Sequence, residues 1–260
     1  MNRNFATIIV LGTSILANVH FLIKHFRTSR AQQEPTFYQK SIQSLNTVRY
    51  SEVCKRFGEL SNSSCGLLFM GDSVPNLLVS DLEDKRNEGD LEEPWISVLN
   101  GGFRNRCISG VTTVGINQLL DKVTLPKSDN IFLWIGINDL LMKRTVSDIE
   151  GNYREILGKL RRADPKARIV VVSVLPVCNS GDDINASIAA LNIRLTSIAK
   201  DAGAKFIDVR PAVVDATGNR DPASTWDGTH PNASALTRIE KIVADATDNI
   251  EGQHLFPVGQ

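Results

Sequence analysis

Short runs of consecutive apolar residues alternate along most of this chain with longer stretches in which apolar residues recur every three or four positions. The runs are typical of buried strands and lie at residues 67–70, 95–99, 131–135, 169–172 and 204–209. The periodic stretches predict helices over residues 42–60, 114–123, 146–163, 184–202 and 231–247. Strands separated by helices imply βαβ units and a parallel sheet. The pattern therefore predicts an α/β fold.

The amino-terminal stretch over residues 5–23 breaks this alternation, because it is apolar throughout most of its length and carries no charge. Its length suits a membrane span and exceeds the apolar core of most cleaved signal peptides. No uncharged small-residue cleavage site follows it. We therefore expect an uncleaved membrane anchor rather than a signal peptide, and either of these rather than a buried helix.

The orientation of this anchor is less well defined by the flanking charges. Arg3 precedes the stretch, whereas Lys24, Arg27 and Arg30 follow it. More positive charges follow the stretch than precede it, and the positive-inside rule therefore favours a cytoplasmic domain. Bacterial chains with such a short amino-terminal tail more commonly export the domain. We favour an exported domain and leave the cytoplasmic side open.

Composition places the remainder of the chain in an ordinary globular class. With 42% hydrophobic residues and 260 residues in all, the chain has room for one α/β domain and a terminal segment. We divide it into an anchor or signal segment (1–25), a linker with a leading helix (26–65), the main domain (66–250) and a tail (251–260). The 29 basic and 29 acidic residues balance, which argues against a nucleic-acid partner. The sequence does not predict an oligomeric state.

The cysteines indicate no metal site. Cys54, Cys65, Cys107 and Cys178 form no Cys-x-x-Cys pair and lie at no zinc-ligand spacing from a histidine. Neither a glycine-rich phosphate loop nor a dinucleotide fingerprint is present. We expect no metal and no cofactor, and we interpret most of the cysteines as small buried hydrophobic residues. A Cys54–Cys65 disulfide is compatible with an oxidising compartment, and the sequence leaves it open.

Candidate chemistry begins at Gly71-Asp72-Ser73, directly after the first apolar run. A serine at the carboxyl end of a strand is a candidate nucleophile if a base can reach it. His230 is the only histidine placed well within the domain, and Asp227 precedes it by three residues. A carboxylate at that spacing can hydrogen-bond the imidazole and fix its tautomer.

Two further stretches follow predicted strands and could supply hydrogen-bond donors to an oxyanion. They are residues 105–110, which end at Gly110, and residues 136–139, which include Asn138. A glycine N–H can approach a ligand closely, and an asparagine amide adds a second donor. Trp95, Trp226 and Cys107 could line a pocket nearby, but we favour core packing for all three.

These segments together resemble the SGNH (GDSL-type) hydrolases. The four sequence blocks of that family match, in order, Gly71-Asp72-Ser73, then Gly110, then Gly136-x-Asn138-Asp139, and finally Asp227-x-x-His230. The likeness extends roughly over residues 66–247. It implies a flavodoxin-like three-layer α/β/α sandwich and cleavage of esters, thioesters or acyl groups from lipids and carbohydrates. The Gly-x-Ser-x-Gly signature of the α/β-hydrolase fold is missing at this serine.

The resemblance assigns a role to each matched position. Ser73 is implied as the nucleophile, His230 as the base and acid, and Asp227 as the carboxylate that orients the histidine. The N–H groups of Ser73 and Gly110 and the side chain of Asn138 are implied as the oxyanion hole.

One position departs from the family pattern. Many members carry an acidic or polar residue after the glycine of the second block, and this chain has Val111. The change removes a loop hydrogen bond but keeps the Gly110 N–H. Asp72 and Asp139 are interpreted as residues that organise the loops.

We therefore expect a membrane-anchored serine esterase or acylhydrolase that works through an acyl-enzyme, deacetylating a carbohydrate or hydrolysing a lipid ester. An acyltransferase that uses a polysaccharide hydroxyl in place of water is the alternative. A non-catalytic binding protein with the same fold is the third interpretation, and the matched site residues weigh against it.

Overall fold

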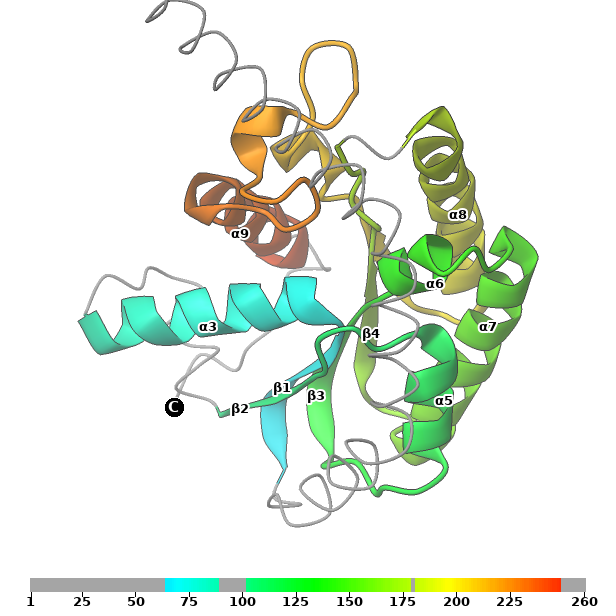
Figure 1. Cartoon of the computed structure of the whole chain (residues 1–260). Helices are drawn as coiled ribbons and strands as arrows, with labels where there is room; N and C mark the ends of the chain where they lie inside the picture. The colour runs from blue at the N-terminus through cyan, green and yellow to red at the C-terminus, as the bar shows by residue number, and fades with distance from the viewer. Residues whose placement is uncertain (1–63, 89–101, 179–180, 249–260) are drawn as a thin grey trace, which may run out of the picture. The chain divides into compact units, whose positions relative to one another are not determined.

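The computed structural model of the chain describes residues 64–88, 102–178 and 181–248, which build a parallel sheet between two layers of helices (Figure 1). The strands are β1 (Cys65–Gly71), β2 (Phe103–Cys107), β3 (Ser128–Trp134), β4 (Arg168–Val172) and β5 (Lys205–Ile207). The helices are α3 (Ser73–Glu88), α5 (Thr113–Leu120), α6 (Ile137–Leu141), α7 (Val146–Ala163), α8 (Gly181–Asp201) and α9 (Ala233–Asp248), with short 3₁₀ turns η2 (Arg210–Ala212) and η3 (Pro222–Ser224).

The sheet has the strand order β2-β1-β3-β4-β5, with every neighbouring pair parallel. This is the flavodoxin-like order, in which the chain leaves β1 for one edge and then returns to its other side. The loops after β1, β2 and β3 therefore meet at one edge of the sheet. The fold expected from the sequence is confirmed.

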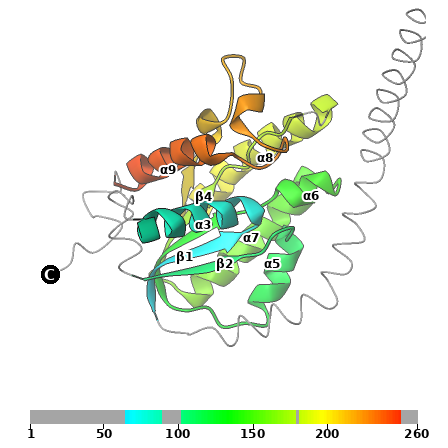
Figure 2. The same cartoon turned by 60° about the vertical axis from the view of Figure 1, so that its left-hand side comes forward.

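Successive side chains of β1 point to opposite faces of the sheet, and a layer of helices covers each face. Leu67 and Phe69 pack with side chains of α3 and α9, whereas Leu68 and Met70 pack with those of α5, α7 and α8. Because both faces of a central parallel strand are covered, its residues are apolar without interruption. α3 and α9 lie side by side in both views of the molecule (Figures 1 and 2).

Most of the predicted elements in the described residues form close to their predicted limits, and α7 has the bounds that the sequence predicted. A capping box between Thr145 and Asp148 begins this helix. The strand predicted over 95–99, the helix predicted over 42–60 and the stretch 5–23 lie outside the described residues. None of the helices in the three described ranges is long and apolar enough to cross a membrane.

Apart from the short 3₁₀ turns, three elements were not predicted. α3 was missed because charged and polar residues fill its second half and leave no clear helical period. β2 occupies residues that the sequence suggested as a loop, because its side chains are polar and mostly half-buried. It lies at the edge of the described sheet and pairs with β1 alone, so backbone hydrogen bonds rather than apolar packing maintain it. α6 replaces the turn expected at 136–139, since one helical turn is too short to show a period.

Cys65 shows how the first strand begins. Its thiol is buried and free, and its Sγ lies 3.3 Å from Ser128 Oγ on β3. Cys54, the other half of the disulfide that the sequence left open, lies outside the described residues.

The turn after β1 requires glycine at position 71. Gly71 pairs with Cys107 on one side and Trp134 on the other. A Cβ at this position would lie 2.0 Å from the Trp134 carbonyl oxygen and 2.7 Å from Pro75 Cγ. Only a residue without a side chain allows the strands to approach this closely, and the place of Ser73 follows from that approach.

Asp72, the next residue, is buried at the same turn. Its Oδ1 accepts a hydrogen bond of 3.0 Å from the Val74 N–H. Burial raises the pKa of Asp72 to about 7, because it outweighs the Val74 hydrogen bond and because the Asp139 carboxylate adds to the rise. The carboxyl is therefore neutral in the folded protein below about pH 7.

We expect Gly71→Ala to destabilise the protein by more than about 3 kcal/mol, because the added methyl group would collide with backbone that cannot move independently. Gly151→Ala is the matched control: this glycine lies in α7, and a Cβ there would meet nothing of the surrounding structure within 4 Å. That control should stabilise the protein by about 0.5–1 kcal/mol. Urea unfolding of the full chain measures both, and a Gly71→Ala variant as stable as the control would contradict the close approach.

We also expect Asp72→Asn to change the pH dependence of stability. Since the folded pKa is about 7 and the ordinary value 3.8, the folded state binds an extra proton between these values, and wild-type stability falls as pH rises through that window. An amide cannot ionise and still accepts from Val74. The variant should match wild type near pH 4 and exceed it at pH 8, by on the order of 4 kcal/mol at full ionisation. Parallel unfolding curves across this range would refute the assignment.

Candidate active site

Ser73 and His230 meet at the carboxyl edge of the sheet although 157 residues separate them in the sequence. Ser73 opens α3 directly after the β1 turn, and His230 lies in the loop before α9. Ser73 Oγ and His230 Nε2 are 2.8 Å apart, and His230 Nδ1 lies 2.6 Å from Asp227 Oδ2. An ionised carboxylate only accepts, so Nδ1–H donates to Asp227 and Nε2 is left to accept from the serine hydroxyl.

Asp227 holds the histidine by its backbone as well as its ring. Asp227 Oδ1 accepts from the N–H groups of Thr229 at 2.9 Å and His230 at 2.7 Å. Burial alone raises the pKa of Asp227, but these hydrogen bonds and the imidazole outweigh it and hold that pKa below its ordinary value. The carboxylate is therefore ionised at neutral pH, as its part in the pair requires.

Of the three predicted oxyanion donors, Gly110 and Asn138 lie on the segments that flank this serine. Gly110 follows β2 with a φ of 81°, a left-handed conformation that favours glycine. The Ile108 N–H donates to the Gly71 carbonyl at 2.8 Å and ties this loop to the β1 turn. Asn138 lies in α6 after β3, buried, and its amide donates to the Val111 carbonyl at 3.0 Å. An amide has two N–H groups, so one remains for another acceptor.

Asp139 compensates for the apolar residue at position 111. Its carboxylate accepts from the Thr113 N–H at 2.9 Å and from Thr113 Oγ1 at 2.7 Å. The Val111 side chain packs against Gly115, where a Cβ would lie 2.7 Å from Val111 Cγ2. Burial raises the pKa of Asp139, and the two Thr113 donors oppose the rise. The loop after β2 is thus joined to the loop after β3 without a polar residue at 111.

Among the aromatic and cysteine candidates, the core-packing prediction for Trp226 is wrong. Its side chain is 66% exposed and stacks on His230, with ring centroids 5.3 Å apart and an interplanar angle of 17°. A single tryptophan in a loop carries no periodicity that tells an inward from an outward position. Cys107 is partly buried and packs against the core between the sheet and α3, as predicted. Trp95 lies outside the described residues.

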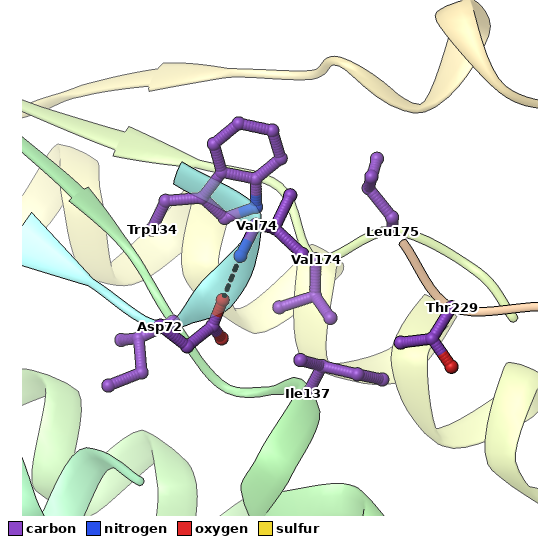
Figure 3. A pocket seen from close by; sticks show the side chains of 8 residues that line it. Asp72, Val74, Trp134, Ile137, Val174, Leu175 and Thr229 are labelled. Atoms are coloured by element: carbon purple, nitrogen blue, oxygen red, sulfur yellow. Dashed lines mark hydrogen bonds between the residues drawn. The ribbon is translucent and has the colours of Figure 1, made fainter. Parts of the chain in front are cut away.

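A small cavity of about 10 Å³ lies next to these residues, with room for about one water molecule (Figure 3). Residues within or next to three of the four matched blocks line it, namely Asp72 and Val74 beside Ser73, Ile137 beside Asn138, and Thr229 beside His230. Trp134, Ile135, Val174 and Leu175 complete the wall. Apart from Asp72, which belongs to the first block, no sequence signal marks these lining residues before the fold brings them together.

Within the described ranges, no three side chains of His, Cys, Asp or Glu gather closely enough to hold a metal ion.

Solved structures with this fold include three bacterial proteins. A putative platelet activating factor from Streptococcus pneumonia has a TM-score of 0.63 at 22% identity, covering 80% of this chain and 98% of its own. A GDSL-like lipase from Bacteroides thetaiotaomicron has a TM-score of 0.60 at 21% identity, covering 76% of this chain and 96% of its own. An acetylxylan esterase from Geobacillus stearothermophilus has a TM-score of 0.53 at 20% identity, covering 76% of this chain and 98% of its own. At these identities the likeness establishes the fold alone.

Comparison of the sequence with family models and with curated proteins tests the family of the chain as well as its fold. No curated protein matches the chain at a significant level. The model of the GDSL-like lipase/acylhydrolase family, in contrast, matches residues 69–235, a span that begins in β1 and ends in α9. Because that match covers most of the chain and includes the serine, asparagine, aspartate and histidine described above, the chain belongs to the GDSL-like lipase/acylhydrolase family, the SGNH-type serine esterases.

Proposed function

We propose that this protein hydrolyses a short-chain carboxylic ester through an acyl-enzyme formed on Ser73. The observation that carries the proposal is the continuous hydrogen-bonded series from Ser73 through His230 to Asp227. In a family of acylhydrolases, this series offers an activated nucleophile at an accessible edge of the sheet.

In the first half of the reaction, Ser73 Oγ attacks the ester carbonyl while His230 Nε2 takes the hydroxyl proton. The resulting imidazolium is stabilised by the ionised Asp227, which stays deprotonated throughout. The tetrahedral intermediate collapses, the bond to the alcohol oxygen breaks, and His230 returns its proton to that oxygen. The alcohol leaves, and the acyl group remains on Ser73.

In the second half, a water molecule takes the place of the alcohol. His230 accepts a proton from the water as its oxygen attacks the acyl carbonyl, and then donates that proton to Ser73 Oγ as the acyl bond breaks. The products are the carboxylic acid, which loses its proton to solvent, and the regenerated serine.

Each half-reaction places negative charge on the carbonyl oxygen, and the family pattern assigns three donors to that oxygen. Ser73 is the first residue of α3, so its N–H has no acceptor within the helix and lies at the positive end of the helix dipole. The Gly110 N–H and the second Asn138 N–H supply the other two. Donors fixed in advance stabilise this charge without reorganising during the reaction.

The comparison with solved structures favours a small acyl group. The acetylxylan esterase that shares the fold acts on an acetyl ester, and this likeness supports an acetyl ester as the substrate. Transfer to a polysaccharide hydroxyl, membrane attachment through residues 5–23 and an exported domain stay predictions from the sequence.

Ser73→Ala should abolish labelling by a fluorophosphonate and lower kcat on a short-chain p-nitrophenyl ester by at least about 10³-fold, because no other group can form the acyl-enzyme. Ser80→Ala is the matched control, since Ser80 lies on the same helix and its hydroxyl donates to the Asn76 carbonyl. The control should label and turn over like wild type. A Ser73→Ala variant that keeps a tenth of the wild-type kcat would exclude the acyl-enzyme, and the melting temperature checks that the fold is intact.

Asn138→Ala should lower kcat by about 10²- to 10³-fold and change KM little, because its amide acts on charge that exists only in the transition state. Thr113→Val is the control: it removes the hydroxyl donor to Asp139 between the same two loops and leaves the amide in place. It should cost stability of about 1–3 kcal/mol with a far smaller loss of kcat. Equal losses of kcat in the two variants would make Asn138 a loop residue and not an oxyanion donor.

A further inference from the structure

The indole of Trp226 stacks on one face of the His230 imidazole. The centroid separation of 5.3 Å and the angle of 17° describe an offset stack, the arrangement that aromatic rings favour. Despite this contact, 66% of the side chain is exposed. Burial of a tryptophan in the core would contribute more to stability, so this position is not explained by folding alone.

Hydrogen bonds fix the loop that carries the indole. Thr225 pairs with Pro231 across the base of the loop, and Thr225 Oγ1 donates to the His230 carbonyl at 2.6 Å. The same hydroxyl accepts from the Gly228 N–H at 3.0 Å, and the Gly228 carbonyl accepts from the Cys178 N–H. Trp226 is therefore presented at a defined place beside His230.

The chemistry of the proposed reaction assigns this place to the alcohol half of the ester. His230 Nε2 must return its proton to the departing alcohol oxygen, so that oxygen lies within hydrogen-bond reach of the imidazole. Whatever is attached to it extends alongside the imidazole. Trp226 is the aromatic ring stacked on that imidazole, so its exposed surface borders the space in which we place the alcohol.

The surroundings of the indole favour a sugar over a lipid or a protein surface. Within the described residues the only other large hydrophobic side chain with comparable exposure is Ile193 on α8. The neighbours of Trp226 in its loop are Thr225 and Asp227. A lipid or a protein partner would need a contiguous apolar patch, whereas a sugar ring lays one C–H face on a single flat aromatic and leaves its hydroxyls to polar groups and water.

Building on the proposed function, we infer that Trp226 is a substrate-binding residue that stacks on the sugar ring of an acetylated carbohydrate. The stack orients the ring so that the ester oxygen on it faces His230 Nε2. Trp226 thereby selects esters of cyclic sugar alcohols over esters of small open-chain alcohols.

The test compares two acetyl esters that share the acyl group and differ in the alcohol: fully acetylated methyl xyloside and ethyl acetate. Release of acetic acid from each gives kcat/KM, and the ratio of the two values measures preference for the sugar. Any effect of a substitution on His230 itself acts on both esters and cancels in this ratio. The variants are Trp226→Ala, Trp226→Phe and, as a control of comparable exposure outside the loop, Ile193→Ala.

Trp226→Ala should lower the sugar preference by about threefold to tenfold, the worth of one aromatic contact. Trp226→Phe should recover most of it, because a flat ring is restored, and Ile193→Ala should leave it unchanged. A preference that changes by less than about twofold in Trp226→Ala would overturn the inference while the proposed function stands. So would a wild-type protein that hydrolyses ethyl acetate but not the sugar acetate. Failure of wild type on both esters would instead refute the proposed function, and this inference with it.

Discussion

The hydrogen bond between Ser73 and His230 is the contact on which the rest of the site depends. It joins the start of α3 to the loop before the last helix, 157 residues apart. The bond forms only if β1 ends where it does and if α9 begins where it does, because Ser73 follows the turn after β1 and His230 lies in the loop just before α9. The packing of α3 beside α9, on the same face of the sheet, fixes those two ends relative to each other. Core packing thus sets a distance that catalysis needs.

The geometry of the sheet then brings the remaining groups to the same place. Since β2 and β3 flank β1, the loops that carry Gly110 and Asn138 must lie on either side of Ser73. Gly71 is the position where this crowding is greatest, because neighbouring backbone occupies the space of a side chain. Gly71 is therefore needed because the neighbouring strands come close together, whereas Ser73 is needed for its hydroxyl group. The two residues belong to one sequence motif but meet two different requirements.

Much of this arrangement could be predicted from the sequence, and the exceptions have physical reasons. Continuous apolar runs located β1, β3 and β4, and helical periods located α5, α7, α8 and α9, because burial of one face or of both leaves a strong pattern. β2 and α6 left none, since one is a polar edge strand and the other a single turn. α3 was missed as well, because charged residues fill its second half. Ser73, Asp227 and His230 were found by type and spacing. The outward position of Trp226 was missed, because it depends on the tertiary contact with His230.

The three aspartates around the site show how the fold distributes charge there. Asp72 and Asp139 are buried, and burial raises both of their pKa values. Asp227 lies in a more open loop, where N–H donors hold its pKa low. Negative charge is therefore more favourable on the carboxylate that faces His230 than on the two buried carboxylates. The surroundings of these three aspartates, and not their residue type, separate the carboxylate that pairs with the histidine from the two that accept hydrogen bonds within the loops.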